Sequence, residues 1–435
     1  MRYLSTRDAT HATSLGEAIT QGLAPDGGLY VPETLPRVEA AALGSPSDLA
    51  GLAERLLTPF AAGDELLSAR LGEIARDAFS FPAPIVEVEG TGTPLAVLEL
   101  FHGPTAAFKD FGARFLAATL ERIPQTDPRR LTVLVATSGD TGGAVAAAFH
   151  GRPWVDVVVL YPRGLVSPRQ QQQLTCWGGN VQTLSVAGTF DDCQRMVKDA
   201  FVDPALARSL RLSSANSINV GRLLPQMVYY AKASLELARR DGQAPNFIIP
   251  TGNLGNALAC VWARQAGLPI GEIVLASNDN RTVPEFLQTG EWRPRPSVVT
   301  LASAMDVGNP SNMERLRWLF PDHLQRRGQV EAQSVSDDDI RATIRRDYQE
   351  LGQTWCPHTA TAACVYRRLE PARRAARWVL VATAHPAKFN DVVEPLIGTD
   401  VPVPESLAAL LALPSRQVEV EPGLESLRVA LMEAA

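Results

Sequence analysis

The sequence predicts an α/β fold in which an open parallel sheet carries helices on both faces. Short continuous apolar runs, typical of buried parallel strands, alternate with helical patterns along most of the chain. The strand-like runs are residues 131–136, 155–160, 181–186, 246–250, 273–277 and 378–383. The helical patterns are residues 144–150, a polar stretch from Ser167 and Pro168, and residues 191–202 and 256–266.

The remaining elements divide the chain into three parts. With 435 residues, the chain exceeds what one core usually supports. We expect an N-terminal module over 1–90, in which Gly22–Pro32 forms a tight turn, residues 47–79 are helical and a strand-like run starts at residue 82. A core of two α/β lobes follows over 91–400. The C-terminal tail, 401–435, predicts a terminal helix and an extended end.

Composition narrows the functional classes. The net charge of −6, without a basic tail, argues against a nucleic-acid binder. No apolar run reaches membrane-spanning length, and the first residues lack the core of a signal peptide, so we expect a cytoplasmic protein with no membrane partner. The five cysteines form no Cys-x-x-Cys pair, so we expect neither a zinc site nor a disulfide framework.

One lysine, Lys109, lies in an otherwise small and apolar stretch, residues 102–114. An ammonium in such a setting loses hydration, which lowers its pKa and makes the nucleophilic amine accessible. A lysine that forms a Schiff base with an aldehyde cofactor requires this property. By itself, the pattern also fits a surface lysine whose stem packs at the start of a helix.

Two further features follow predicted strands, where open α/β sheets bind ligands. The loop Thr251–Asn256 offers backbone N–H groups at a helix start, a setting that binds phosphate. Thr383 places a hydroxyl where it can hydrogen-bond an unprotonated pyridine nitrogen. Alone, each feature also fits an ordinary turn. Together with Lys109 they indicate pyridoxal 5'-phosphate, which needs both a lysine and a phosphate cradle.

The stretch His102–Arg114 resembles the lysine motif of the threonine synthase family. Other segments resemble motifs of this family in the same order: residues 22–32, 137–143, 161–164, 214–219, 251–255, 304–307, 357–360 and 383–389. The resemblance covers about residues 3–400 and is to the bacterial and fungal branch. It implies a two-lobed pyridoxal-phosphate enzyme of fold type II, similar to the β subunit of tryptophan synthase, with an added N-terminal module.

The resemblance also implies roles for individual residues. Lys109 would hold the cofactor as an imine, and Thr383 would face its pyridine nitrogen. The phosphate cradle would consist of Gly252, Asn253, Leu254, Gly255 and Asn256. The loop that faces the substrate carboxylate and cofactor ring would be Ser138, Gly139, Asp140 and Thr141. Candidates for binding the leaving phosphate are Arg163, Arg222 and the 217–219 loop with Ser217 and Asn219; for each arginine a surface ion pair is the alternative.

The implied activity is that of a lyase in threonine biosynthesis, which converts O-phospho-L-homoserine and water into L-threonine and phosphate. Lys109 would also be the base at the substrate α-carbon. We interpret His358 and His385, each beside a proline in a predicted loop, as structural, with proton transfer as the alternative role. Another enzyme of this fold, such as a serine/threonine dehydratase, or a non-catalytic relative remains an alternative. We expect a monomer or a homodimer.

Overall fold

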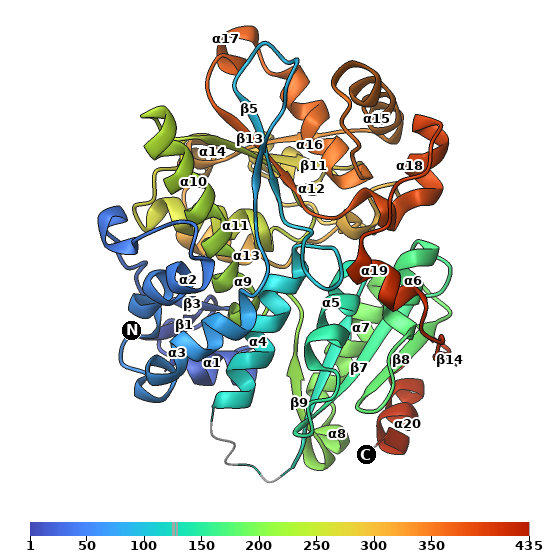
Figure 1. Ribbon diagram of the computed structural model, residues 1–435. Coiled ribbons are helices and arrows are strands. Elements are labelled where there is room, and N and C mark those ends of the chain that lie inside the picture. The colour runs from blue at the N-terminus through green and yellow to red at the C-terminus, as the bar shows by residue number, and fades with distance from the viewer. Residues whose placement is uncertain (124–126, 128, 435) are drawn as a thin grey trace.

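Two sheets of mainly parallel strands organise the chain, one in each lobe (Figure 1). The computed structural model describes residues 1–123, 127 and 129–434. The large lobe, at the top of Figure 1, follows the strand order β12-β11-β10-β13-β5-β4, with only β4 antiparallel to its neighbour. Its strands are β4 (Ile85–Glu87), β5 (Leu95–Glu99), β10 (Asn246–Pro250), β11 (Ile273–Ser277), β12 (Glu331–Ser334) and β13 (Trp378–Ala382).

Both faces of the large sheet are buried. Along β10, Phe247 and Ile249 enter one hydrophobic core and Ile248 enters another, as the period of two in a strand requires. Helix α16 contacts β10, β11 and β13, and α11 contacts β11. The helices and 3-10 turns from residue 220 onward, tail excepted, are α9 (Val220–Leu223), η3 (Leu224–Gln226), α10 (Met227–Asp241), α11 (Gly255–Gln265), α12 (Thr282–Thr289), η4 (Ser303–Met305), α13 (Met313–Leu319), α14 (His323–Gln329), α15 (Asp337–Leu351), α16 (Pro357–Arg368), α17 (Pro371–Arg374), η5 (Pro386–Phe389) and α18 (Asn390–Ile397).

The small lobe contains a fully parallel sheet of order β14-β8-β7-β6-β9. Its strands are β6 (Leu131–Ala136), β7 (Val155–Pro162), β8 (Val181–Val186), β9 (Arg211–Ser214) and β14 (Val418–Val420). Helix α4 (Lys109–Arg122) precedes β6. The helices between β6 and β9 are α5 (Asp140–Phe149), α6 (Pro168–Thr175), α7 (Phe190–Val202) and α8 (Pro204–Ser209). Helix α5 begins four residues before the predicted start at residue 144, because the chain already turns into the helix after Gly139, whose φ is 132°.

The N-terminal module packs a small antiparallel sheet beside three helices. The sheet order is β2-β1-β3, and α3 packs against α4 of the core. Its elements are β1 (Tyr3–Ser5), β2 (Ala12–Thr13), α1 (Leu15–Gln21), β3 (Tyr30–Pro32), η1 (Ala40–Leu43), α2 (Leu49–Leu57), η2 (Thr58–Ala61) and α3 (Glu65–Ala78). Strand β4 lies within the predicted 1–90 module but pairs with β5, so it is part of the large sheet.

The C-terminal tail joins the two lobes instead of ending as one helix and an extended end. It contains α19 (Glu405–Leu411), β14 and α20 (Leu424–Ala434). Strand β14 pairs in parallel with β8, and α20 packs on α7. Leu427 is fully buried in this contact. In Figure 1 the red tail descends from α18 beside the large lobe to α20 at the far end of the small lobe.

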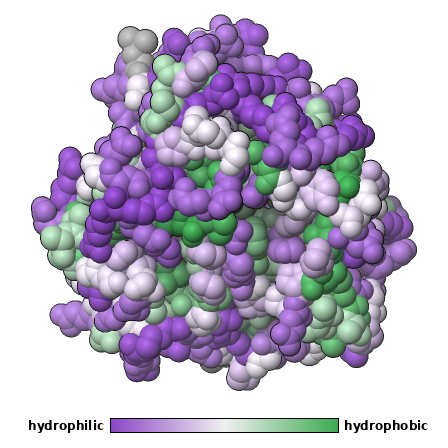
Figure 2. Space-filling view, turned by 45° about the horizontal axis from the view of Figure 1, so that its top comes forward, coloured by the Kyte–Doolittle hydropathy of each residue, from purple (hydrophilic) through white to green (hydrophobic). Residues whose placement is uncertain are grey.

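The surface is mainly polar. Hydrophilic residues cover most of the face seen in Figure 2, and hydrophobic residues gather in hollows between them. Within the described residues, no helix is both long and apolar enough to cross a membrane.

Candidate active site

The loop that carries Lys109 is fixed to the end of β13. Phe108 donates its backbone N–H to the Thr383 carbonyl oxygen at 2.9 Å, and His385 donates its backbone N–H to the Ala106 carbonyl oxygen at 3.0 Å. Ala106 has a φ of 54°, a left-handed conformation that is uncommon outside glycine. These bonds place Lys109 as the first residue of α4.

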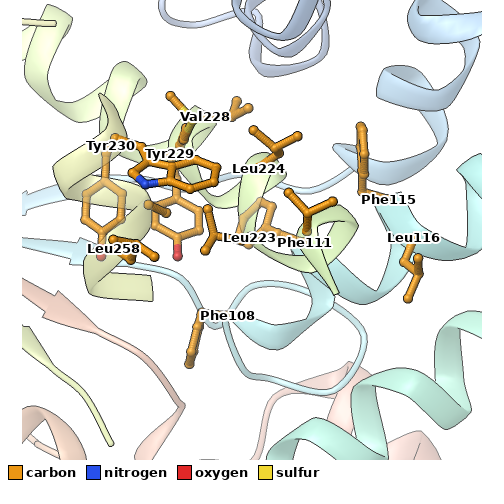
Figure 3. Close-up of a cluster of buried hydrophobic side chains, with 14 of the residues drawn as sticks. Phe108, Phe111, Phe115, Leu116, Leu223, Leu224, Val228, Tyr229, Tyr230 and Leu258 are labelled. Carbon is orange, nitrogen blue, oxygen red and sulfur yellow. The ribbon is translucent and has the colours of Figure 1, made fainter. Parts of the chain in front are cut away.

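An aromatic cluster supports α4 from behind. The ring centroids of Phe111 and Phe81 are 4.5 Å apart, and those of Phe111 and Tyr229 are 5.4 Å apart. Figure 3 shows Phe111 and Tyr229 within a cluster of apolar side chains from α4, α9, η3, α10 and α11, with Phe108 at its edge. Dense packing of this kind restricts movement of the helix, so the position of the Lys109 backbone is well defined.

The Lys109 ammonium is in an environment that favours the neutral amine. Burial lowers its pKa to about 8; the nearby Arg222 contributes to this decrease, while Asp140 opposes it. The Nζ atom lies 4.6 Å from the centroid of the Phe108 ring and forms no ion pair or hydrogen bond with any described residue. These surroundings are of the kind that a nucleophilic lysine requires, so the assignment of Lys109 stays a prediction that fits the structure.

The predicted phosphate cradle lines the same pocket as Lys109. Leu254 adopts a φ of 63° directly before α11 begins at Gly255, and the backbone N–H groups of residues 252–255 donate to no acceptor among the described residues. A Cβ at Gly252 would lie 2.7 Å from the Met305 Cα and carbonyl oxygen atoms, so only glycine fits there. Unpaired amides at a helix N-terminus suit a phosphate dianion, and this geometry fits the phosphate of pyridoxal phosphate.

The asparagine side chains of the cradle hold the loop in shape. The Asn253 amide donates to Ser217 Oγ at 2.8 Å, while Asn253 Oδ1 accepts the backbone N–H of Ser311 at 2.6 Å. Asn256 donates to the Pro250 carbonyl oxygen at 3.0 Å and accepts the Thr251 hydroxyl at 2.7 Å. The backbone amides of the loop therefore remain available to a ligand.

Thr383 also lines the pocket, and its side chain is 5% exposed. Its carbonyl oxygen is bonded to Phe108, but its hydroxyl has no hydrogen-bond partner among the described residues. The alternative that the hydroxyl satisfies its own turn is therefore not supported. A neutral hydroxyl on a residue that lines this pocket fits a pyridine nitrogen.

Arg222 brings a buried cation to the pocket. Its side chain is 2% exposed, donates from one terminal nitrogen to the Ala215 carbonyl oxygen, and has a buried Nε atom with no acceptor. Burial lowers its pKa to about 10, which leaves the guanidinium charged near neutral pH. A buried cation that lines the pocket fits an anionic ligand.

The structure gives the other predicted substrate residues different surroundings. Asp140 and Ser217 line the pocket, whereas Ser138, Gly139, Thr141, Arg163 and Asn219 do not. Arg163 pairs with Glu419 at 3.3 Å on the surface. The buried Asn219 side chain donates to the Ile19 and Ser214 carbonyl oxygens and caps α9.

Sequence reasoning missed several pocket residues. Their types are common in any core; the pocket residues that were not predicted as site residues are Phe108, Gln226, Pro250, Thr251, Ala304, Met305 and His358. The sequence predicts His358 in a loop, but the residue lies in the first turn of α16. There its Nε2 atom accepts the backbone N–H of Ala304 at 3.1 Å. Burial lowers its pKa to about 4. The sequence signal that could have identified His358 as a site residue is its position in the family-like motif 357–360.

The comparison with protein families agrees with this site. A family described as "Pyridoxal-phosphate dependent enzyme" matches residues 79–384, the range that holds Lys109, the cradle and Thr383. The fold and the site therefore define a pyridoxal-phosphate-dependent enzyme of fold type II. In the described residues no cluster of three or more candidate side chains could hold a metal ion.

More specific matches cover the rest of the chain. "Threonine synthase N terminus" matches residues 2–79, and "Threonine synthase, C-terminal" matches residues 359–430, so the family likeness extends into the tail. The threonine synthase of Escherichia coli is 40% identical, with 99% of both chains covered. The chain belongs to the threonine synthase family.

Solved structures agree with this assignment. The crystal structure of threonine synthase from Escherichia coli matches with a TM-score of 0.92 and 38% identity, covering all of both chains. That of "PLP bound Threonine synthase from Brucella melitensis" matches with a TM-score of 0.88 and 35% identity, covering 100% of this chain and 99% of the other. A threonine deaminase structure has a TM-score of 0.54 and 18% identity over 74% of this chain, a likeness of fold alone.

Proposed function

We propose that this chain converts O-phospho-L-homoserine and water into L-threonine and phosphate. One observation carries the choice of substrate: the pocket of Lys109 contains both a cradle of unpaired amides and the buried guanidinium of Arg222. The cradle accounts for the phosphate of pyridoxal phosphate. The buried cation provides for another anion, which suits a phosphorylated substrate.

The proposed cofactor residues are those that the pocket brings together. Lys109 would bond to the aldehyde of pyridoxal phosphate, the amides of residues 252–256 would bind its phosphate, and Thr383 would donate to its pyridine nitrogen. When bound, pyridoxal phosphate supplies an aldehyde for amines and a ring system that takes up negative charge from the substrate. Because Thr383 is neutral, it contributes no charge that would keep the pyridine nitrogen protonated.

Lys109 is the proposed acid and base of the reaction. Its lowered pKa makes the amine able to take the proton from the substrate α-carbon near neutral pH and to return it later. The fixed start of α4 keeps Nζ over one part of the pocket, so the same atom serves both transfers. The other polar groups of the pocket stabilise the charged groups of the substrate and the cofactor during these proton transfers.

Arg222 and Ser217 are the proposed partners of the substrate phosphate. Ser217 Oγ accepts two amide donors, from Asn253 and Asn312, which leaves its own proton free to donate. Charge on a departing phosphate requires donors that are already oriented. For the substrate carboxylate, the proposed site is the loop 138–141 at the N-terminus of α5, where the helix dipole favours an anion; of this loop only Asp140 lines the pocket in the structure.

Product analysis tests this proposal. The purified enzyme is supplied with O-phospho-L-homoserine, and phosphate and threonine are both quantified; equal amounts are expected. Phosphate with 2-oxobutyrate but no threonine would mean elimination without productive addition of water. No reaction with this substrate, together with ammonia release from serine or threonine, would favour a dehydratase.

The quaternary structure and cellular location are further proposals. We propose a monomer or a homodimer, which sedimentation velocity would distinguish. A reducing cytoplasm is compatible with the cysteines, which are all buried and unpaired.

A further inference from the structure

Lys388 is a second lysine beside the site, and the proposed mechanism leaves it unused. It lies in η5, is fully buried, and places its Nζ atom 2.7 Å from Asp140 Oδ1. The same ammonium donates to the Thr105 carbonyl oxygen at 2.8 Å. A buried ammonium is costly without such partners, so these contacts fix its position.

The contacts of Lys388 connect three parts of the site. Asp140 begins α5 in the small lobe, η5 follows β13 of the large lobe, and Thr105 precedes Lys109 in its loop. The Lys388 carbonyl oxygen also accepts the hydroxyl of Ser167, the N-cap residue of α6. Lys388 therefore bonds to both sides of the boundary between the lobes.

Asp140 faces two lysines but pairs with only one. It lines the pocket of Lys109, yet its carboxylate is bonded to Lys388 and to Gln170 Nε2, the latter at 3.0 Å. Lys109 forms no ion pair with a described residue. An opposite charge close to an ammonium stabilises its protonated form, so the partner of Asp140 affects which lysine can become a free amine.

We propose that Lys388 is a positioning residue that occupies the Asp140 carboxylate and so leaves Lys109 as the lysine able to react. The proposal depends on the proposed role of Lys109 but not on the identity of the substrate. Among the described residues that line this pocket, Lys109 carries the only ammonium. A new pair between Asp140 and Lys109 would hold the proton on Nζ.

The other charged groups around Asp140 and Lys109 are consistent with a paired Lys388 and an unpaired Lys109. Burial alone would raise the pKa of Asp140, but Lys388 and His358 outweigh it and hold the pKa below its usual range. From α9, Arg222 lowers the pKa of Lys109, whereas Asp140 raises it. Asp110 on α4 is turned toward Thr105, whose N–H and hydroxyl it accepts at 2.9 and 2.7 Å.

The test measures the proton affinity of Lys109 directly. The full chain, freed of cofactor, is labelled with trace acetic anhydride across a pH series, and labelling of the Lys109 peptide is quantified by mass spectrometry. In Lys388→Met, we expect the midpoint of Lys109 labelling to move upward by about 1–2 pH units. Adding Asp140→Asn should move it back toward the wild-type value, because the competing carboxylate is gone.

A purely structural tether predicts a different result. Lys388→Met would then lower thermal stability without moving the labelling midpoint, and this result would overturn the proposal. If Lys388→Met does not fold, the comparison is between Asp140→Asn alone and the double variant. These two variants should have the same midpoint of Lys109 labelling, because Lys388 acts on Lys109 through the Asp140 carboxylate, which both variants lack. A difference of about one pH unit between the midpoints would contradict the proposal. Substrate turnover plays no part in this readout, so failure of the proposed substrate would be a separate result.

Discussion

The backbone N–H of Phe108 donates to the carbonyl oxygen of Thr383 at 2.9 Å. This bond joins the residue before Lys109, the proposed cofactor lysine, to the residue that follows β13. Since Phe108 and Thr383 are far apart in the sequence, the bond fixes the distance between the two ends of the proposed cofactor site. The Thr383 side chain can therefore be altered without removing this coupling.

Thr383→Val tests the hydroxyl separately from the backbone contact. Valine keeps the shape and the carbonyl oxygen but removes the donor to the pyridine nitrogen. We expect about a tenfold loss of kcat, the usual scale for one hydrogen bond, while Thr383→Ser retains most of the activity. Steady-state kinetics of both variants provide the measurement. Equal activity in the valine variant and the wild type would mean that the hydroxyl has no such partner.

Gly252→Ala tests the close packing of the cradle. The added Cβ would meet the Met305 backbone at 2.7 Å, so the loop must shift and affinity for pyridoxal phosphate should fall by at least tenfold. Titration of cofactor absorbance measures this affinity. The control is Gly328→Ala in α14, where a Cβ meets nothing within 4 Å. That change should leave affinity unchanged and add about 0.5–1 kcal/mol of stability.

Arg222→Gln and Arg163→Gln separate the two arginines that were predicted to bind phosphate. Arg222 is buried in the pocket, whereas Arg163 forms an exposed ion pair with Glu419. Loss of a charged hydrogen bond to the substrate should lower kcat/KM of the Arg222 variant by about 10- to 100-fold. Loss of an exposed ion pair has little effect, so the Arg163 variant should remain within about twofold. The reverse order in kcat/KM would contradict the assignment.

His358 gives the protein a stability term that depends on pH. Burial lowers its pKa to about 4, compared with about 6.5 in the unfolded chain. Between these values the unfolded chain binds the proton and the folded chain does not, so this term decreases as the pH falls from about 6.5 to 4 and is constant above that range. His358→Gln, which retains an acceptor for the Ala304 N–H, should remove that decrease.

Urea unfolding of the wild type and the His358→Gln variant from pH 4 to 8 measures the difference. Asp110 and Asp306 act in the opposite direction, because burial raises their pKa values to about 6 and about 7. Their stabilising contributions are lost as the pH rises through those values. Both residues are present in the two proteins, so the difference isolates His358. A difference that is constant across the pH series would contradict the assignment.

Leu427→Ala tests whether the tail is part of the small-lobe core. Leu427 is fully buried on α20, and truncation of such a side chain costs about 2–5 kcal/mol. Val429 on the same helix is 50% exposed, and Val429→Ala should change the unfolding free energy by less than about 0.5 kcal/mol. Denaturant unfolding compares the two. Equal, small effects would show that α20 does not contribute to the core.

Continuous apolar runs made the central strands predictable from the sequence. The strands at 131–136, 181–186, 246–250 and 273–277 have the predicted bounds, because burial on both faces leaves little choice of residue. Strand β14 has only three residues, of which Val418 and Glu419 are exposed. It exists because it pairs with β8, a contact between distant segments that no local pattern reveals.

The site was predictable where one residue type determines the chemistry. Lys109, the glycines of the cradle and Thr383 are of this kind, and the structure brings them to one pocket. The role of Lys388 could not be predicted, because a lysine in a short segment after a strand is ordinary until its partner Asp140 is known. Arg163 and Asn219 were predicted as substrate residues because of their residue types and their positions in family-like motifs. In the structure Arg163 pairs with Glu419, and Asn219 bonds to backbone carbonyl oxygens.

The identity of the cofactor lysine is the central claim, and borohydride reduction of the cofactor-loaded enzyme tests it most directly. Reduction makes the bond between lysine and cofactor permanent, and peptide mass spectrometry then locates it. We predict the label on Lys109, with none in the Lys109→Ala variant. A label on Lys388, the other buried lysine of the site, would contradict the account.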